Sequence, residues 1–228
     1  MNGSTIDWDG IATVLLDMDG TLLDLHFDSH LWKRHLPWRY AQQHGIDLAS
    51  ASARLVPLLA AQEGTLNWYC LDYWTRELNL DIATLEQEVG HLIAVRPHAI
   101  ELLEFLRRRR QPVVLTTNAH RRSMEHKLVR TGIAGYFDHI VSAHDYGVPK
   151  EQRAFWARLE RHVRYEPRHT LLIDDNPAVL LAARAHGIVH LRGVAQPDSH
   201  GSRRTHDDFQ VIDSFLDLLP VQNAQTQP

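Results

Sequence analysis

Two aspartates at the end of an apolar run are the first feature of this sequence that points to chemistry. Asp17 and Asp19 follow the run Thr13–Leu16, and Gly20 comes directly after them. The run is β-branched or aliphatic without alternation, which is typical of a strand buried on both faces of a parallel sheet. In such sheets the ligand crevice lies at the carboxyl ends of the strands, and glycine permits a sharp turn there. The sequence therefore predicts a catalytic aspartate pair.

Polar residues follow three later apolar runs or turns in the same manner. They are Thr117 with Asn118, Lys150, and Asp174 with Asp175. Each group alone is weak evidence, because such residues are common in loops. Their order on successive helix and strand units is specific, however, because parallel strands end at one edge of a sheet. We expect these side chains to meet there.

The expected meeting of several carboxylates indicates phosphoryl transfer. Converging carboxylates repel one another and need a cation, and oxygen-only ligands select a hard ion such as Mg²⁺. A carboxylate can attack phosphorus to give an aspartyl-phosphate, while a neighbouring carboxyl protonates the leaving alkoxide and later activates water. The hydroxyl of Thr117, the ammonium of Lys150 and backbone amides could neutralise the phosphoryl oxygens.

The four groups together resemble the motifs of the haloacid dehalogenase (HAD) superfamily of Mg²⁺-dependent phosphohydrolases. The resemblance implies that Asp17 is the nucleophile and that Asp19 is the general acid and base. It also implies that Thr117, Asn118 and Lys150 bind the phosphoryl group.

The same resemblance implies the ligands of the metal. They would be Asp17, the backbone carbonyl of Asp19, and Asp175, while Asp174 would either assist through water or orient Lys150. No acidic residue stands four positions after Asp175, so only the compact Asp-Asp form of the last motif applies.

Further phrases resemble the bacterial branch of that superfamily that removes the 5′-phosphate from the purine nucleotides GMP and IMP. They lie at 22–25, 27–28, 65–74, 117–120 and 147–151. The resemblance implies a purine nucleoside monophosphate as substrate. Trp68, Asp72 and His120 are the predicted substrate contacts, although a capping or solvated role for His120 remains open.

An aromatic group surrounds two of these residues. Leu66, Tyr69, Cys70 and Tyr73 recur at helical spacing, which predicts a stripe that packs inside the helical segment. Trp68 and Asp72, four residues apart, fall on another face of the same predicted helix. That face is the better candidate for contact with substrate.

The elements that must position these residues follow from periodicity and punctuation. Between the first strand and Arg96 the sequence predicts only helices, at Phe27–His44, Leu48–Glu63, Leu66–Leu78 and Ile82–Leu92. A block of about 70 residues is too long for a strand-to-helix loop, so we expect an inserted all-helical cap subdomain at 26–95. Residues 1–25 and 96–228 would form the α/β core domain.

Alternating helices and strands follow the inserted block and predict a doubly wound parallel sheet. The expected later strands are 112–117, 138–142, 170–174 and 188–191, and Val211–Leu219 is expected to be a short final helix. Asn176 and Pro177 are expected to begin a helix that ends at Gly187.

Composition excludes several classes of function. The 228 residues carry a formal charge of −4, so no global basic field recruits nucleic acid polymers or an anionic membrane, and the local run Arg107–Arg110 suits a helix end. No apolar run is long enough to span a membrane, and the first ten residues do not resemble a signal peptide. A single cysteine excludes disulfides within the chain and a cysteine-based zinc cluster. The sixteen histidines are scattered without the spacing that places two ligands on one helical face, so the sequence disfavours zinc. We expect a cytoplasmic enzyme whose oligomeric state the sequence does not indicate.

Rival functions remain open at this point. The same core could serve a sugar-phosphate phosphatase or a phosphomutase. Asp19 disfavours a dehalogenase, which attacks carbon and protonates no ester oxygen. Outside enzymes, a phospho-receiver domain or a silent phosphate-binding module uses similar residues, although a receiver lacks the helical insertion.

Overall fold

The protein is built on a six-stranded parallel sheet. The computed structural model describes residues 6–205 and 208–220 and places the strands in the order β3-β2-β1-β4-β5-β6. The strands are β1 (Thr13–Leu16), β2 (Val113–Thr117), β3 (His139–Ser142), β4 (Thr170–Ile173), β5 (His190–Val194) and β6 (Val211–Ile212). The order changes direction at β1, which pairs with β2 on one side and β4 on the other. The predicted doubly wound α/β fold is confirmed.

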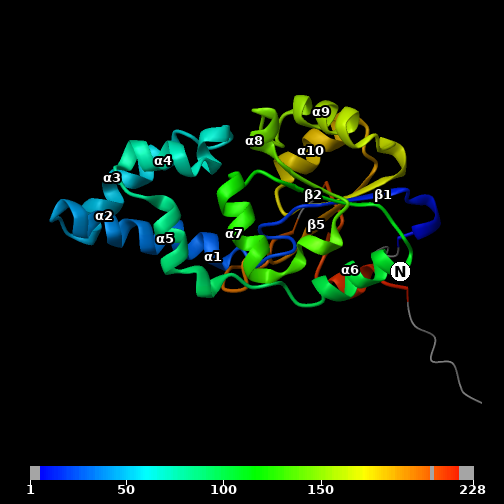
Figure 1. Ribbon diagram of the computed structural model, residues 1–228, viewed down its shortest axis with the longest axis horizontal. Coiled ribbons are helices and arrows are strands. Elements are labelled where there is room, and N and C mark those ends of the chain that lie inside the picture. Colours follow the sequence, from blue (N-terminus) through cyan, green and yellow to red (C-terminus); the bar gives the residue numbers. More distant parts are fainter. Residues whose placement is uncertain (1–5, 206–207, 221–228) are drawn as a thin grey trace, which may run out of the picture.

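The sheet is covered on both faces, as the apolar run of β1 predicts. Val14 and Leu16 belong to one hydrophobic cluster and Leu15 belongs to another, because successive side chains point to opposite faces. Figure 1 shows α6 and α7 on one side of the sheet and α8, α9 and α10 on the other. These helices are α6 (Ala99–Arg108), α7 (Arg121–Thr131), α8 (Ala143–Tyr146), α9 (Arg153–Val163) and α10 (Pro177–His186). As expected, Asn176 caps α10 and Gly187 ends it.

An all-helical segment lies between β1 and α6 and extends away from the sheet (Figure 1). It has a hydrophobic cluster of its own, which contains Phe27, Leu55, Trp74 and Leu85. Its helices are α1 (His26–His30), α2 (Leu36–His44), α3 (Leu48–Ala60), α4 (Leu71–Leu78) and α5 (Ile82–Glu88). The expected inserted helical segment is therefore present.

The first predicted helix of this segment contains a π-helical turn, η2 (Leu31–His35), between α1 and α2. Pro37 lies at the beginning of α2 and has no N–H to donate. The N–H of Leu36 bonds to the carbonyl of Leu31, five residues earlier. The helix therefore continues through this wider turn and past Pro37 to His44.

Two other helices of the segment differ from the prediction. The expected helix Leu66–Leu78 is divided into a 3₁₀ helix, η3 (Leu66–Tyr69), and α4, because Cys70 between them is extended. The expected helix Ile82–Leu92 ends at Glu88 and is followed by a 3₁₀ turn, η4 (Gly90–Leu92).

The carboxyl-terminal end corrects a further prediction. Val211–Leu219 is not one helix: Val211 and Ile212 form β6 beside β5, and Phe215–Leu218 forms a 3₁₀ helix, η7. The predicted strand 188–191 is also displaced, since β5 runs from His190 to Val194.

Within the described residues, no helix has both the length and the apolar character needed to cross a membrane.

Candidate active site

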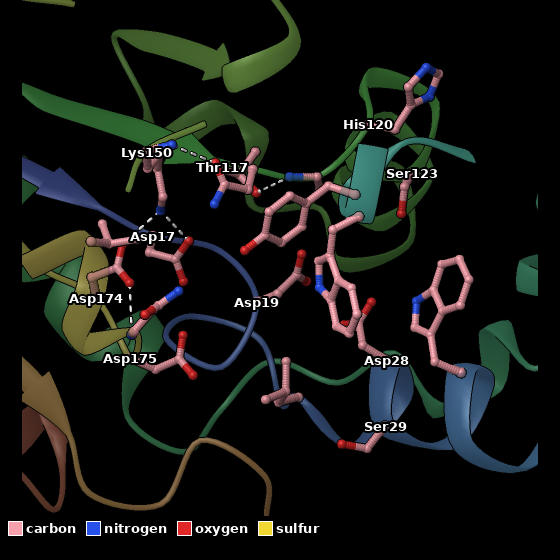
Figure 2. A pocket seen from close by; sticks show the side chains of 18 of the residues that line it. Asp17, Asp19, Asp28, Ser29, Thr117, His120, Ser123, Lys150, Asp174 and Asp175 are labelled. Atoms are coloured by element: carbon pink, nitrogen blue, oxygen red, sulfur yellow. Dashed lines mark hydrogen bonds and ion pairs between the residues drawn. The ribbon is translucent and has the colours of Figure 1, made fainter. Parts of the chain in front are cut away.

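Lys150 brings together the ends of three strands. Its Nζ donates to Asp17 Oδ1 at 2.6 Å, to Asp174 Oδ2 at 2.7 Å and to the carbonyl oxygen of Thr116 at 2.9 Å. Figure 2 shows the lysine above the two carboxylates. The Lys150 side chain is 2% exposed, so burial alone would disfavour its charge, but the carboxylates of Asp17 and Asp174 raise its pKa above the usual range. The site therefore contains a fixed positive charge.

Asp17 has one engaged oxygen and one free oxygen. Oδ1 accepts from Lys150, whereas Oδ2 is buried and has no hydrogen-bond partner among the described residues. Burial raises the pKa of Asp17 to about 7; Lys150 opposes this effect and Asp174 adds to it. A buried oxygen without a partner is costly unless a ligand or reaction uses it.

Three carboxylates are positioned to share a cation. Oxygens of Asp17, Asp174 and Asp175 lie within 4.8 Å of one another. Burial, together with the charges of Asp17 and Asp174, raises the pKa of Asp175 well above its usual value. Its nearest cation is the half-exposed Arg204, at 3.6 Å. A buried, oxygen-only, negatively charged group of this kind fits a hard ion such as Mg²⁺.

Gly20 permits the approach of Asp175. Its φ is +85°, and a Cβ atom there would lie 2.7 Å from Asp175 Cγ. Any other residue would have both a strained backbone and a steric clash. The glycine that follows the aspartate pair is thus required by a carboxylate more than 150 positions later.

Thr117 and Asn118, at the end of β2, form hydrogen bonds with neighbouring loop residues. Thr117 Oγ1 accepts from the N–H of Ala119 at 3.0 Å, which leaves its hydroxyl proton available. Asn118 Oδ1 accepts from the N–H of Lys150 at 2.9 Å, and its Nδ2 donates to Glu151 at 2.9 Å. Asn118 therefore braces the loop that carries Lys150.

A second buried lysine contacts Asp19. Lys127 Nζ, from α7, donates to Asp19 Oδ1 at 2.8 Å and to both oxygens of Asp28 at 2.8 and 3.0 Å. Although burial opposes it, the carboxylates of Asp19 and Asp28 raise the pKa of Lys127 above its usual value. Burial and the adjacent Asp19 raise the pKa of Asp28 to about 7, although Lys127 opposes the change. The lysine joins the β1 loop to the first helix of the inserted segment.

Lys127 is not among the residues predicted from the sequence, but its position on α7 carries a signal. Ser123 and Lys127 stand four residues apart on the buried side of a helix that also buries Met124 and Leu128. Polar residues on an apolar helical face need partners. Ser123 finds one in Glu86, its Oγ donating to Oε1 at 2.6 Å.

A cavity of about 410 Å³ connects these groups with the inserted segment. Figure 2 shows Asp28 and Ser29 of that segment on the far side of Asp19 from the Lys150 group. The predicted catalytic, phosphate-binding and metal residues all line it: Asp17, Asp19, Thr117, Asn118, Lys150, Asp174 and Asp175. Trp68 and His120, two of the three predicted substrate contacts, line it as well. Asp72 does not; it is exposed, 3.4 Å from Arg122 and 3.5 Å from His120.

Tyr69 corrects the prediction of a stripe packed inside the helical segment. It lines the cavity, and its hydroxyl donates to Glu151 Oε1 at 2.7 Å. Because the chain is extended at Cys70, residues on either side do not share one helical face. Of the predicted stripe, only Tyr73 packs against the segment's own cluster, while Leu66 packs against the core.

Comparisons with known proteins agree with this geometry. The family model described as haloacid dehalogenase-like hydrolase matches residues 11–187. GMP/IMP nucleotidase YrfG of Escherichia coli (strain K12) is 36% identical over 215 residues, which cover 94% of this chain and 97% of that protein. (S)-2-haloacid dehalogenase 2 of Pseudomonas sp. (strain CBS-3) is 25% identical over 78% of this chain and 81% of that protein.

Among solved structures, a HAD phosphatase from Thermococcus onnurineus superposes with a TM-score of 0.74 at 20% sequence identity. The match covers 88% of this chain and 93% of that chain and shows a common fold. With the family model matching most of the sequence and the strand-end groups assembled in one cavity, this chain belongs to the haloacid dehalogenase-like hydrolases.

Proposed function

We propose that the protein is a Mg²⁺-dependent phosphomonoesterase that hydrolyses purine 5′-nucleotides, GMP and IMP, through an aspartyl-phosphate. The observation that carries the reaction is the buried, unpartnered Oδ2 of Asp17 beside the charge of Lys150. The choice of substrate rests on the 36% identity, over nearly the whole chain, with a GMP/IMP nucleotidase.

In the first step an oxygen of Asp17 attacks phosphorus and the bond to the 5′ oxygen breaks. Asp19 gives its proton to that leaving oxygen, since an alkoxide is a poor leaving group. Lys150 and the Thr117 hydroxyl neutralise the phosphoryl oxygens. Asp19 then takes a proton from the water that cleaves the aspartyl-phosphate, which restores Asp17 and releases phosphate.

Asp17, the backbone carbonyl of Asp19, and Asp175 would hold Mg²⁺, which when bound neutralises carboxylate and phosphoryl charge. Asp174 would act mainly on Lys150, to which it is hydrogen-bonded at 2.7 Å. Lys127 would act as a positioning residue by holding the Asp19 carboxylate, with which it shares a 2.8 Å hydrogen bond.

We further propose the division of labour between the two parts of the chain. Residues 1–25 and 96–228 would form the core domain that performs the chemistry, and residues 26–95 would form a cap that selects the substrate and excludes water. Support comes from the cavity lining, to which the inserted segment contributes Asp28, Trp32, Trp68, Tyr69 and Glu86.

A screen of phosphate release with Mg²⁺ tests the function directly. The panel contains GMP, IMP, AMP, CMP, free sugar phosphates and p-nitrophenyl phosphate. We expect the highest kcat/KM for GMP and IMP. A higher kcat/KM for sugar phosphates would contradict the substrate assignment, and the absence of phosphate release from every compound would contradict the phosphatase itself.

A further inference from the structure

One cysteine and two histidines meet outside the aspartate group. Ligand atoms of Cys70, His120 and His144 lie within 4.8 Å of one another. They come from three separate places: the extended residue before α4, the residue before α7, and α8. Because their sequence spacing follows no metal motif, the group is visible only in the fold.

Each of the two histidines has one buried ring nitrogen without a hydrogen-bond partner among the described residues. His120 Nδ1 and His144 Nε2 are buried and have no hydrogen-bond partner within residues 6–205 and 208–220. The two rings are nearly perpendicular, with centroids 5.0 Å apart. Buried ring nitrogens without partners are unusual, and a bound ion is one of the things that satisfies them.

One of the two histidines also has a carboxylate beside its second ring nitrogen. His120 Nε2 lies 3.5 Å from Asp72 Oδ2, and a carboxylate on the second nitrogen is the common support of a ligating histidine. Cys70 Sγ accepts from the N–H of Tyr73 at 3.4 Å.

We propose that Cys70, His120 and His144 form a transition-metal site, with Zn²⁺ as its ion, that bridges the inserted helical segment and the α/β core. One thiolate and two imidazoles suit zinc rather than magnesium, and three protein ligands leave a position for water. Ligand atoms around tetrahedral zinc lie about 3.4–3.6 Å apart at the usual bond lengths. The ligand atoms, which lie within 4.8 Å of one another, are therefore at most about 1.4 Å farther apart than in a closed tetrahedral zinc site.

The site would fix one wall of the catalytic cavity. Cys70 directly follows Trp68 and Tyr69, and His120 itself lines the cavity. The ligands of the proposed zinc site are distinct from the aspartates that would hold Mg²⁺. Zinc bound here would tie the start of α4 to the start of α7.

The sole cysteine of the chain allows a clean test. The full-length protein, with Mg²⁺ in excess, is treated with iodoacetamide, and the rate of Cys70 alkylation is measured with and without Zn²⁺. We expect Zn²⁺ to slow alkylation at least 10-fold. We expect His144→Ala and His144→Gln to lose this protection. We expect His169→Ala to keep it, because His169 is exposed and lies at the amino end of β4.

Two outcomes overturn the proposal. One is an alkylation rate that Zn²⁺ does not change in the parent protein; the other is protection that persists in both His144 variants. Alkylation rates without zinc, compared between variants and parent, show whether the packing around Cys70 is intact. Neither measurement involves substrate, so failure of the proposed phosphatase function leaves the test unaffected.

Discussion

At the scale of single residues, Asp17 and Asp19 are two positions apart in different environments. Asp17 is paired with Lys150, and its Oδ2 has no partner in the part of the chain that the structure describes. Asp19 is paired with Lys127 on the side of the inserted segment. The same lysine chemistry therefore serves two roles. In the proposed mechanism, Lys150 neutralises the site of attack and Lys127 holds the proton carrier.

Replacement of Asp17 by asparagine removes the proposed nucleophile but keeps an acceptor for Lys150. We expect phosphate release from GMP to fall by about 10³-fold or more, because an amide oxygen does not form the phospho-enzyme. Steady-state kinetics measure the effect, and a thermal unfolding scan controls for folding. Near-normal turnover by a folded variant would exclude Asp17 as the nucleophile.

Replacement of Lys127 by methionine leaves Asp19 and Asp28 facing each other without a cation. Removal of one partner of a buried ion pair leaves the other charge buried and unpaired, and lowers the free energy of unfolding by about 3–5 kcal/mol. We expect Lys127→Met to be destabilised on this scale in urea, and Lys127→Met with Asp28→Asn to recover part of the loss. Activity should remain low in both, since neither holds Asp19.

Arg130→Met is the matched control, because Arg130 is an exposed cation on the same helix. We expect it to change neither stability nor activity appreciably. If the double variant were no more stable than Lys127→Met, the pairing with Asp28 would not be the source of the cost.

The aspartates could be predicted from the sequence and Lys127 could not, for a physical reason. Local sequence context is enough to predict Asp17, Asp174 and Lys150, because each follows an apolar run or a turn. Lys127 is defined by partners 108 and 99 positions away, Asp19 and Asp28. Only the packing of α7 against both the core and the insertion brings these residues together.

At the scale of elements, the position of Cys70 decides what the inserted segment presents to the cavity. A continuous helix over 66–78 would have placed Tyr69 and Tyr73 on one face. The extended residue instead separates them, so Tyr69 reaches Glu151 while Tyr73 packs inside the segment. Helical periodicity was correct within each piece and misleading across the break.

The expected helix Val211–Leu219 was wrong for a related reason. Val211 and Ile212 are β-branched, but the pairing that makes them a strand is with Gly193 and Val194, some 18 positions earlier. A two-residue strand has no periodicity of its own. Its register becomes visible only once β5 is in place.

Trp68 belongs to η3, and its side chain lines the cavity. Stacking of a base on an aromatic ring contributes about 1–3 kcal/mol, so we expect Trp68→Ala to lower kcat/KM for GMP by about 5-fold or more. Because a pyrimidine offers a smaller ring for stacking, we expect a smaller loss for CMP and therefore a lower ratio of kcat/KM for GMP over CMP. The backbone carbonyl of Trp68, which accepts from Trp74 Nε1 at 3.1 Å, is kept in the variant.

Trp38→Ala on α2 is the control, since its side chain is 46% exposed and does not line the cavity. It should leave the ratio unchanged. An unaltered ratio in Trp68→Ala would show that this tryptophan does not select the base. Trp32 and Tyr69, which also line the cavity, would then be the next candidates.

At the scale of the whole molecule, the candidate active site gathers several negatively charged carboxylates at the junction of β1, β2 and β4. Buried Lys150 pairs with Asp17 and Asp174, whereas the half-exposed Arg204 lies 3.6 Å from Asp175. This concentration of carboxylates opposes folding unless another cation binds. Since the strands that carry them form the centre of the sheet, a cation bound there stabilises the entire fold.

We therefore expect Mg²⁺ to stabilise protein that has been freed of metal with a chelator. A ligand that binds only the folded state adds about 2.7 kcal/mol at 100 times its Kd, which for a chain of this size raises Tm by roughly 5–10 °C. Differential scanning fluorimetry across a Mg²⁺ series, beside phosphate release in the same samples, measures both effects. Asp175→Asn should lose the Tm shift and the activity together, whereas Asp9→Asn, whose carboxyl group is 92% exposed, should keep both. A shift of equal size in Asp175→Asn would place the ion elsewhere, and phosphate release that is indifferent to the chelator would exclude Mg²⁺ from the reaction.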